Sequence, residues 1–594
     1  MQLLNDQNKR GTVYSSTGNL QIDYALHFLP ELHFNLNLGY QVSKNQWTNV
    51  TAPNSIMAWR GSYKNGAGTY WNKYELQRNT LLDFYVNYRK DFEAIKSNLD
   101  VMAGYSWQHF DYHGRENTVF NTLGYTASFA GSTWTLMEDP STAANIGQTY
   151  NNTPKVYWAG PQQLVSFFGR INYSFDDTYL LTFTLRDDAS SRFSKENRWG
   201  LFPSLALGWK IINMPFMEPT RGWWNDLKLR LGWGVTGQQQ VAGLFPYMAT
   251  YTLSQKPYTY LDPSGSGQWI EALYPKAYDT NIKWEETTTW NVGLDFGFLN
   301  NRITLAADWY LRKTKDLLAF SPNAGMNTSN YMDRNIGSLE NTGVEFTATA
   351  RPVVTNDFTW TTGLNIAYNK NKITKLTGDA ASSQIEANGT PSGTGGGLQF
   401  HLVGHPAYSY YVYEQVYDNQ GNPVEGQYVD QNADGKIDDA DRIVYHSPDP
   451  KWTLSWNNTF NYKNWDLGFV LRANLGNYVY NGPRYERTRP VNNLFGYQLQ
   501  NLIADDYLFT SVAPSAVSNY YVENASFLRC DNITLGYTME NVIKNALNLR
   551  FYAAVQNPFV ITKYKGLDPE VNGGIDNNCY PRPVTYTLGI VATF

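Results

Sequence analysis

Residues 585–594 read TYTLGIVATF, and the alternation in this stretch decides the fold class. The even-numbered residues from Tyr586 to Phe594 are apolar or aromatic, and those between them are mostly small or polar. A β-strand alternates its side chains with a period of two, so this stretch has one apolar face and one polar face. Such a strand suits lipid on one side and water on the other.

The same alternation recurs along much of the chain. It is clearest in the stretches 227–234, 290–298, 302–312 and 466–475. Each apolar face covers about nine to eleven residues, the length that a tilted strand needs to cross a bilayer. The opposite face carries Arg230, Asp295, Asp308 and Arg472, which a dry core would not accept unpaired. We therefore predict an all-β fold, a transmembrane antiparallel β-barrel; a soluble β-sandwich or propeller with its polar face outside is the alternative.

Composition agrees with a barrel and excludes other classes. The 594 residues include 44 Tyr, 19 Trp and 29 Phe, and barrels place such rings in girdles at the lipid interfaces, although sugar-binding proteins are also rich in aromatics. No run of eighteen apolar residues occurs, so we expect no transmembrane helix. The net charge of −5 argues against a nucleic-acid partner, which would require a basic surface.

The chain divides into roughly sixteen to eighteen predicted barrel strands. They lie near 15–28, 33–46, 69–92, 97–113, 165–177, 179–193, 199–211, 226–236, 284–299, 301–317, 338–352, 358–375, 451–463, 465–480, 526–538, 548–562 and 584–594. Some connections are tight turns, at 175–178, 299–301 and 462–464. Others, at 114–164, 237–283, 376–450 and 481–525, are long, and we expect them to be irregular extracellular loops, with 380–397 as part of one of them.

The ends of the chain carry a further expectation. Nothing in the sequence resembles a linker, so residues 1–594 are predicted to form one barrel domain. Met1–Gly11 has no apolar core of a signal peptide, and strand-like sequence begins at Leu20–Phe28. We expect the chain to begin inside a barrel that is incomplete at its amino terminus. The strand near Leu20–Phe28 and the strand 585–594 should then face an open seam.

Several stretches, taken in order, resemble one family. They are FFGRINYSFDDTYLLTFTLRDDASSRFSKENRWGLFPSLALGWKI (167–211), IKWEETTTWNVGLDFGFLNNRITLAADWYLRKTKDLL (282–318), NIGSLENTGVEFTATA (335–350), YVDQNADGKIDDADR (428–442) and NPFVITKYKGLDPEV (557–571). Together they resemble the barrel of SusC/RagA-type TonB-dependent outer-membrane transporters.

This resemblance implies a barrel of 22 strands in the outer membrane of a Gram-negative bacterium, with a plug domain inside it. It also implies import of oligosaccharides, or of peptides, with a SusD-like surface lipoprotein and the TonB complex as partners. The plug, the TonB box and the first strands are expected to be absent from this chain. A passive plugless porin and a surface-binding barrel or adhesin are the alternative functions.

One local motif has the spacing of a calcium loop. Asp430, Asn432, Asp434, Lys436 and Asp441 fit the pattern D-x-[DN]-x-[DN]-G followed by an acid at position twelve. Ca²⁺ takes six to eight oxygen ligands, which this spacing wraps around one centre, with the carbonyl group of Lys436 as one of them. The flanks read as strand and loop, so this is no EF-hand. A solvated acidic turn is the alternative.

Enzymatic chemistry has little support, and we predict that the chain is not an enzyme. No HExxH, P-loop or G-x-S-x-G motif occurs. His401 and His405 have no acidic partners at fixed spacing, and the acidic pairs 187–188 and 285–286 are expected at turns or at the rim. Cys530 and Cys579 either pair or remain isolated thiols. The charges on the polar face either guide a substrate or pair with one another.

Overall fold

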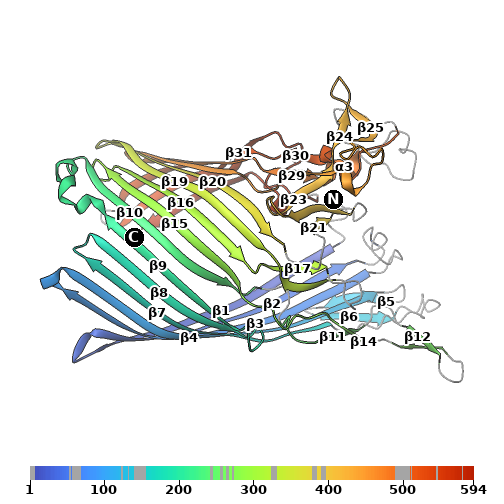
Figure 1. Cartoon of the computed structure of the whole chain (residues 1–594), viewed down its shortest axis with the longest axis horizontal. Coiled ribbons are helices and arrows are strands. Elements are labelled where there is room, and N and C mark those ends of the chain that lie inside the picture. Colours follow the sequence, from blue (N-terminus) through green and yellow to red (C-terminus); the bar gives the residue numbers. More distant parts are fainter. Residues whose placement is uncertain are drawn as a thin grey trace.

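A computed structural model describes residues 7–593 with gaps at 53–54, 56–67, 122–124, 131–132, 139–154, 241–244, 254–257, 262–266, 271–272, 323–330, 377–383, 390–395, 489–508, 510, 544–545 and 578–579. Most of it is one curved antiparallel sheet (Figure 1). None of the helices in the described residues is long and apolar enough to cross a membrane.

The sheet has 17 strands, a number within the predicted range. They are β1 (Gln7–Leu26), β2 (Leu29–Thr51), β3 (Gly68–Phe92), β4 (Ser97–Asn121), β7 (Lys155–Phe175), β8 (Tyr179–Ser190), β9 (Trp199–Lys210), β10 (Trp224–Gln238), β15 (Glu285–Phe298), β16 (Ile303–Lys315), β19 (Ser338–Val354), β20 (Phe358–Lys375), β27 (Trp452–Tyr462), β28 (Trp465–Leu475), β31 (Phe527–Ile543), β32 (Leu547–Thr562) and β34 (Thr585–Thr593). Each strand pairs with the next one along the sheet, because every connection is a hairpin or a loop that returns to the neighbouring strand.

Connections differ between the two ends of the sheet. At one end they are short and include η1 (Glu93–Ile95), η3 (Ile211–Asn213) and η4 (Pro215–Thr220). The tightest turns use left-handed backbone at Asp176, Asp177, Asn300 and Lys463. The other end carries long connections with the small strands β5 (Tyr125–Ala130), β6 (Thr133–Glu138), β11 (Tyr251–Leu253), β12 (Tyr258–Leu261), β13 (Gly267–Ile270), β14 (Leu273–Pro275), β17 (Leu318–Pro322) and β18 (Tyr331–Asn335). This asymmetry is the one expected of an outer-membrane barrel.

The two faces of the sheet differ as the alternation predicts. On the outer face, Leu207, Leu231, Val292, Trp309 and Val344 lie in one cross-strand row from β9 to β19. A second row runs from β28 to β34 through Leu467, Leu535, Ala553 and Leu588. The large apolar side chains of these rows are exposed at the surface, which suits a face covered by lipid.

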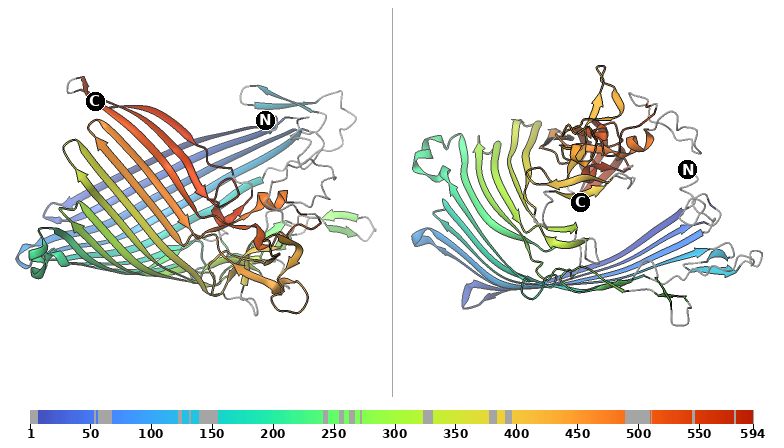
Figure 2. Two further views of the ribbon diagram at one scale, coloured as in Figure 1. Left: turned by 90° about the horizontal axis from the view of Figure 1, so that it is seen from above. Right: turned by 45° about the vertical axis from the view of Figure 1, so that its right-hand side comes forward.

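The sheet is open. Within the described residues, β1 pairs only with β2, and β34 pairs only with β32. The seam predicted between these two strands is therefore present, and Figure 2 shows the curved sheet from two further sides. Phe594 lies outside the described residues.

The long loops near the carboxyl end are not irregular, and in this respect the sequence prediction was wrong. They form a folded cap that contains β21 (Gln384–Gly389), β22 (Gly397–Leu402), β23 (Ser409–Tyr413), β24 (Gln415–Tyr417), β25 (Pro423–Tyr428), β26 (Arg442–Tyr445), β29 (Tyr478–Asn481), β30 (Val522–Asn524), β33 (Ile575–Asp576), α3 (Gly482–Arg487), η5 (Asp439–Asp441), η7 (Asn519–Tyr521) and η8 (Asn572–Gly574). Even the polar segment 380–397 contains a strand, because β21 pairs with β22.

Candidate functional site: a polar inner wall and its loop cap

Three charged side chains meet on the inner face of the sheet, opposite the apolar rows. The guanidinium group of Arg230 on β10 donates to both oxygens of Asp295, each at 2.8 Å, and to Asp308 at 2.9 and 3.0 Å. The triad lies directly over Gly293, where an added Cβ would come within 2.5 Å of Asp308 Oδ1. Glycine is therefore required at this position by space, and one guanidinium group binds both carboxylates within the wall.

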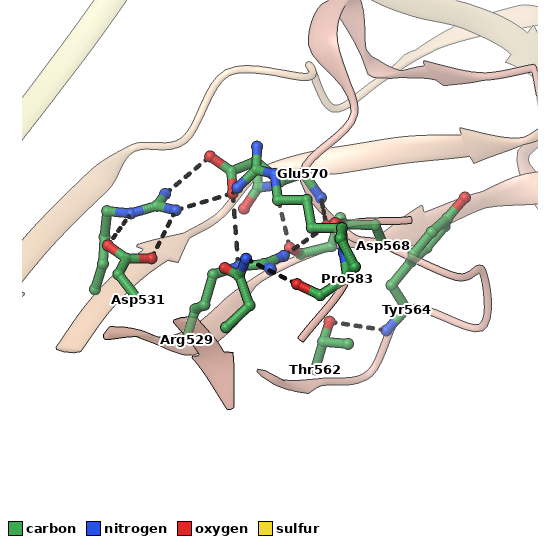
Figure 3. Close-up of polar contacts among 12 residues, drawn as sticks. Arg529, Asp531, Thr562, Tyr564, Asp568, Glu570 and Pro583 are labelled. Atoms are coloured by element: carbon green, nitrogen blue, oxygen red, sulfur yellow. Dashed lines mark hydrogen bonds and ion pairs between the residues drawn. The ribbon is translucent and has the colours of Figure 1, made fainter. Parts of the chain in front are cut away.

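A second group of charges joins the sheet to the last loop (Figure 3). Arg472 on β28 binds Asp531 of β31 at 3.1 Å and Glu570 of the loop 563–584 at 2.9 Å. Arg529 on β31 donates to Asp568 at 2.6 Å, and both side chains of this pair are buried. Because Asp568 and Glu570 belong to the loop while the two arginines belong to the sheet, the group fixes the loop to the wall.

Strands β2–β4 carry uncharged polar groups and paired charges on the same inner face. Asp83 accepts hydrogen bonds from Ser106 at 2.6 Å and from Asn37 at 3.4 Å. Glu75 accepts from Tyr112 at 2.7 Å. The inner wall thus presents hydroxyl and amide groups whose neighbouring charges are already satisfied.

The cap has a hydrophobic core of its own. Tyr410, Val412, Tyr480, Val517 and Tyr521 pack together in it, although they come from two different loops. The hydroxyl group of Tyr410 donates to the carbonyl groups of Gly574, at 2.7 Å, and of Tyr478, at 3.0 Å. One buried side chain thereby ties three loops into one unit, and Figure 2 shows this unit gathered at the long-loop end of the sheet.

The predicted calcium loop lies at the edge of this cap. Asp430 Oδ2 accepts from the N–H of Gly435 at 2.8 Å, and Asp434 Oδ1 accepts from that of Lys436 at 2.8 Å. Asp441 is buried and accepts from the N–H groups of Gln431 and Asp438. The Asp438 N–H is the main reason why the pKa of Asp441 lies below its usual range.

One oxygen of this loop lacks a partner. Asp430 Oδ1 is buried and has no hydrogen-bond partner, an arrangement that suits a cation. Asn432 Oδ1, by contrast, is used by the N–H of Asp434 at 3.0 Å. Among the described residues, no group of three or more His, Cys, Asp or Glu side chains is gathered closely enough to hold a metal ion. Calcium binding therefore stays a prediction.

The other residues singled out in the sequence have ordinary structural surroundings. His401 packs edge-on against Tyr408, and burial lowers the pKa of His401. Asp188 pairs with Arg186, at 2.7 Å. Glu286 pairs with Lys315, at 2.8 Å, and Glu285 accepts from the N–H of Leu318. Cys530 is a buried free thiol, and Cys579 lies outside the described residues.

Sequence reasoning missed the residues that bind the cap to the wall. Arg472 was recognised as an inner charge, but Arg529, Asp568 and Glu570 were not. Arg529 alternates in phase with the apolar Ile533 and Leu535, and only the register shift between Cys530 and Asn532 turns it to the inner face, so periodicity did not mark it. The loop 563–584 has no periodicity, so nothing in it marks the two acids as partners of the sheet.

Comparison with known proteins identifies the family. The model described as TonB dependent receptor-like, beta-barrel matches residues 97–557. The chain belongs to this family. It is an outer-membrane β-barrel chain of the SusC type, since it is 42% identical over 99% of its length to the TonB-dependent receptor SusC of Bacteroides thetaiotaomicron, of which it covers 56%. It is 30% identical over 96% of its length to TonB-dependent receptor P3 of Formosa agariphila, of which it covers 57%.

The chain thus spans about half the length of the curated relatives that it matches. Among solved structures, that of the RagAB peptide transporter superimposes with a TM-score of 0.79. The match covers 100% of this chain and 63% of the transporter's chain, and the two sequences are 22% identical. This likeness shows a shared fold. The relatives are receptors and transporters by name.

Proposed function

We propose that this chain forms the barrel wall of an importer that takes up oligosaccharides across the outer membrane, driven by the TonB complex. The observation that carries the proposal is the 42% identity to SusC, which extends over 99% of the chain. A SusD-like surface lipoprotein is the proposed partner at the long-loop end, where the folded cap stands. The lipid bilayer covers the apolar outer face.

The chemistry of the inner wall supports an uncharged, hydroxyl-rich substrate. The guanidinium groups of Arg230 and Arg472 are each held between two carboxylates. The positive charges of these arginines are therefore compensated, which weakens any attraction for an anionic substrate. The inner face also carries the amide groups of Asn37, Gln41 and Asn79, which line a hollow and can exchange hydrogen bonds with sugar hydroxyl groups. A peptide is the second candidate substrate, because the fold is shared with a peptide transporter.

Uptake by whole cells tests the proposal. Cells that carry the intact gene should import a labelled oligosaccharide, and import should stop on deletion of the gene, on deletion of tonB, or on collapse of the proton gradient by a protonophore. Import that persists without TonB would indicate a passive porin. Surface binding without import would indicate an adhesin, and import of peptides alone would reassign the substrate.

We also propose that Ca²⁺ binds the loop 430–441, with Asp430, Asn432, Asp434, the carbonyl group of Lys436 and Asp441 as ligands. The buried, unpartnered Asp430 Oδ1 supports this proposal. Isothermal titration of the protein with Ca²⁺ alone tests it, and the absence of any binding heat leaves the acidic turn as the role of this segment.

A further inference from the structure

Strands β1–β4 are among the longest of the sheet, and they continue beyond the apolar belt. β1–β4 have 20, 23, 25 and 25 residues, whereas a tilted strand crosses the bilayer with about 9–11. The outer face of β2 carries Leu36 and Leu38 in one half and Lys44 in the other. The change from apolar to polar side chains lies at one level of the sheet. Arg78 of β3 and Asp111 of β4 are in register with each other, and they lie between the level of Leu38 and that of Lys44. The halves of these strands near the long loops therefore stand outside the membrane.

A hollow of about 590 Å³ lies on this projecting wall. It is lined by Lys9, Arg10, Gly11, Trp47, Thr48, Asn49 and Trp71. Gly11 is in register with Trp47, and Asn49 with Trp71, so the lining comes from three adjacent strands. By strand alternation, Trp47 and Trp71 share the inner face with Glu75 and Asp83. The hollow thus opens toward the barrel entrance and not toward lipid.

Trp47 is held flat against the sheet by a glycine. A Cβ added at Gly11 would lie 2.5 Å from Cζ3 and 2.6 Å from Cε3 of the Trp47 ring. One face of the indole therefore covers the backbone of β1, and the side chain remains 41% exposed. Any side chain at position 11 would displace the ring. The pair fixes one large aromatic face in an open position at the surface of the hollow.

Trp71 is fixed by a hydrogen bond. Its indole Nε1 donates to Glu116 Oε1 of β4 at 2.8 Å, which sets the direction of the ring. Trp47 and Trp71 are diagonal neighbours on adjacent strands, since Trp47 is in register with Lys73. Such neighbours are about 7–8 Å apart, so one ligand can contact both rings. Two oriented indoles that are held by the scaffold lose little entropy when a ligand binds.

We propose that Trp47 and Trp71 form a stacking platform for the sugar rings of an oligosaccharide, at which the substrate first contacts the barrel. This inference rests on the proposed function and adds the place at which the oligosaccharide is captured. The C–H face of a pyranose or furanose ring packs on an indole face, while its hydroxyl groups take hydrogen bonds at the ring edge. The amide side chain of Asn49 lines the same hollow and is the polar group beside the two rings.

Binding to the purified full-length protein in detergent tests the platform. The probes are a gluco-, a fructo- and a manno-oligosaccharide and a neutral peptide of similar length, with isothermal titration calorimetry as the measurement. We expect at least one saccharide to bind. Trp47→Ala and Trp71→Ala should each weaken that binding about tenfold or more, as for the loss of one stacking ring. Gly11→Val should have a similar effect, because it displaces the ring of Trp47 without removing it.

Tyr74→Ala is the matched control, since Tyr74 lies on the outer face of the projecting part of β3 and should leave binding unchanged. Unchanged affinity in Trp47→Ala and Trp71→Ala would overturn the platform, as would a wild-type protein that binds only the peptide or no probe. The import assay is independent of this result. Import without TonB would contradict the proposed function even if binding depends on the two tryptophans. TonB-driven import together with unchanged affinities in the variants would contradict only the platform.

Discussion

Arg529 and Asp568 form a buried ion pair, 2.6 Å long, between strand β31 and the last loop of the chain. The two side chains are only 3% and 9% exposed. Asp568 also accepts from the N–H of Glu570, and Glu570 in turn binds Arg472 of β28. The position of the cap on the barrel wall therefore depends on a few charges, of which Arg529 and Asp568 are buried and Arg472 and Glu570 are partly exposed.

Loss of one partner of this pair should be costly. Arg529→Ala leaves Asp568 buried without its cation, and removal of one partner of a buried pair typically costs about 3–5 kcal/mol. We expect loop 563–584 to become sensitive to protease at a lower denaturant concentration. Lys463→Ala, which breaks an exposed pair with Asp357, should cost about 0–1 kcal/mol. Equal protease resistance of the Arg529→Ala variant and the wild type would show that the pair does not fix the loop.

The hydroxyl group of Tyr410 should stabilise the cap as a unit. Tyr410→Phe leaves the carbonyl groups of Gly574 and Tyr478 without this donor, at a cost of about 1–3 kcal/mol. Hydrogen exchange should speed up in all three loops that Tyr410 joins. Tyr411→Phe is the matched control, because the hydroxyl group of Tyr411 makes only a long, exposed bond of 3.4 Å. Faster exchange confined to the neighbourhood of residue 410 would argue against one cooperative cap.

The two faces of the sheet should respond differently to a charge. Phe296→Arg places a cation on the outer face and should cost about 2–4 kcal/mol if the residue lies near the midplane of the bilayer. Thr304 lies on the neighbouring strand β16, next to Leu305, which is in register with Phe296. Thr304→Arg places the cation on the inner face and should cost much less. Urea unfolding in lipid vesicles measures both. Similar costs at the two positions would contradict the assignment of lipid to the apolar face.

The Arg230 triad bears on one expectation from the sequence. The charges of the polar face were expected either to guide a substrate or to pair, and they pair: Arg230→Ala leaves Asp295 and Asp308 facing each other across Gly293. Gly293→Val should disturb the same triad, because a Cβ at that position meets Asp308 and Arg230. Both variants should unfold at lower urea concentration than Lys313→Ala, which removes one exposed, 3.6 Å pair on the same strand as Asp308. Equal midpoints for the three variants would mean that the triad adds nothing to stability.

The loop 430–441 should respond to calcium and to acid. If Ca²⁺ binds, Asp441→Asn should abolish the binding heat, whereas Asp418→Asn, in a separate acidic turn of the cap, should not. The lowered pKa of Asp441 makes a second prediction. Its contribution to stability is complete above about pH 3.9, the ordinary aspartate value, and is lost as the pH falls through the lowered pKa. Hydrogen exchange of residues 430–441 at several pH values measures this loss.

Strand periodicity predicted the sheet because each strand has its own alternation of apolar and polar residues. Leu229 and Leu231 alternate with Arg230 on β10 whatever lies beside them, so every strand of the sheet was located, although β1, β4 and β7 extend about eight to ten residues beyond one of their predicted bounds. The cap escaped prediction for the opposite reason. Tyr410 and Tyr521 pack in one core but are far apart in the sequence, and neither lies in a periodic stretch. Long-range packing and the Arg529–Asp568 pair leave no local pattern to detect.

The central claim is tested most directly by the initial rate of labelled oligosaccharide import in cells with and without a functional TonB. This account predicts rapid import that depends on the gene and falls to the background of the deletion strain when TonB is removed. The same rate of import in the absence of TonB would contradict it.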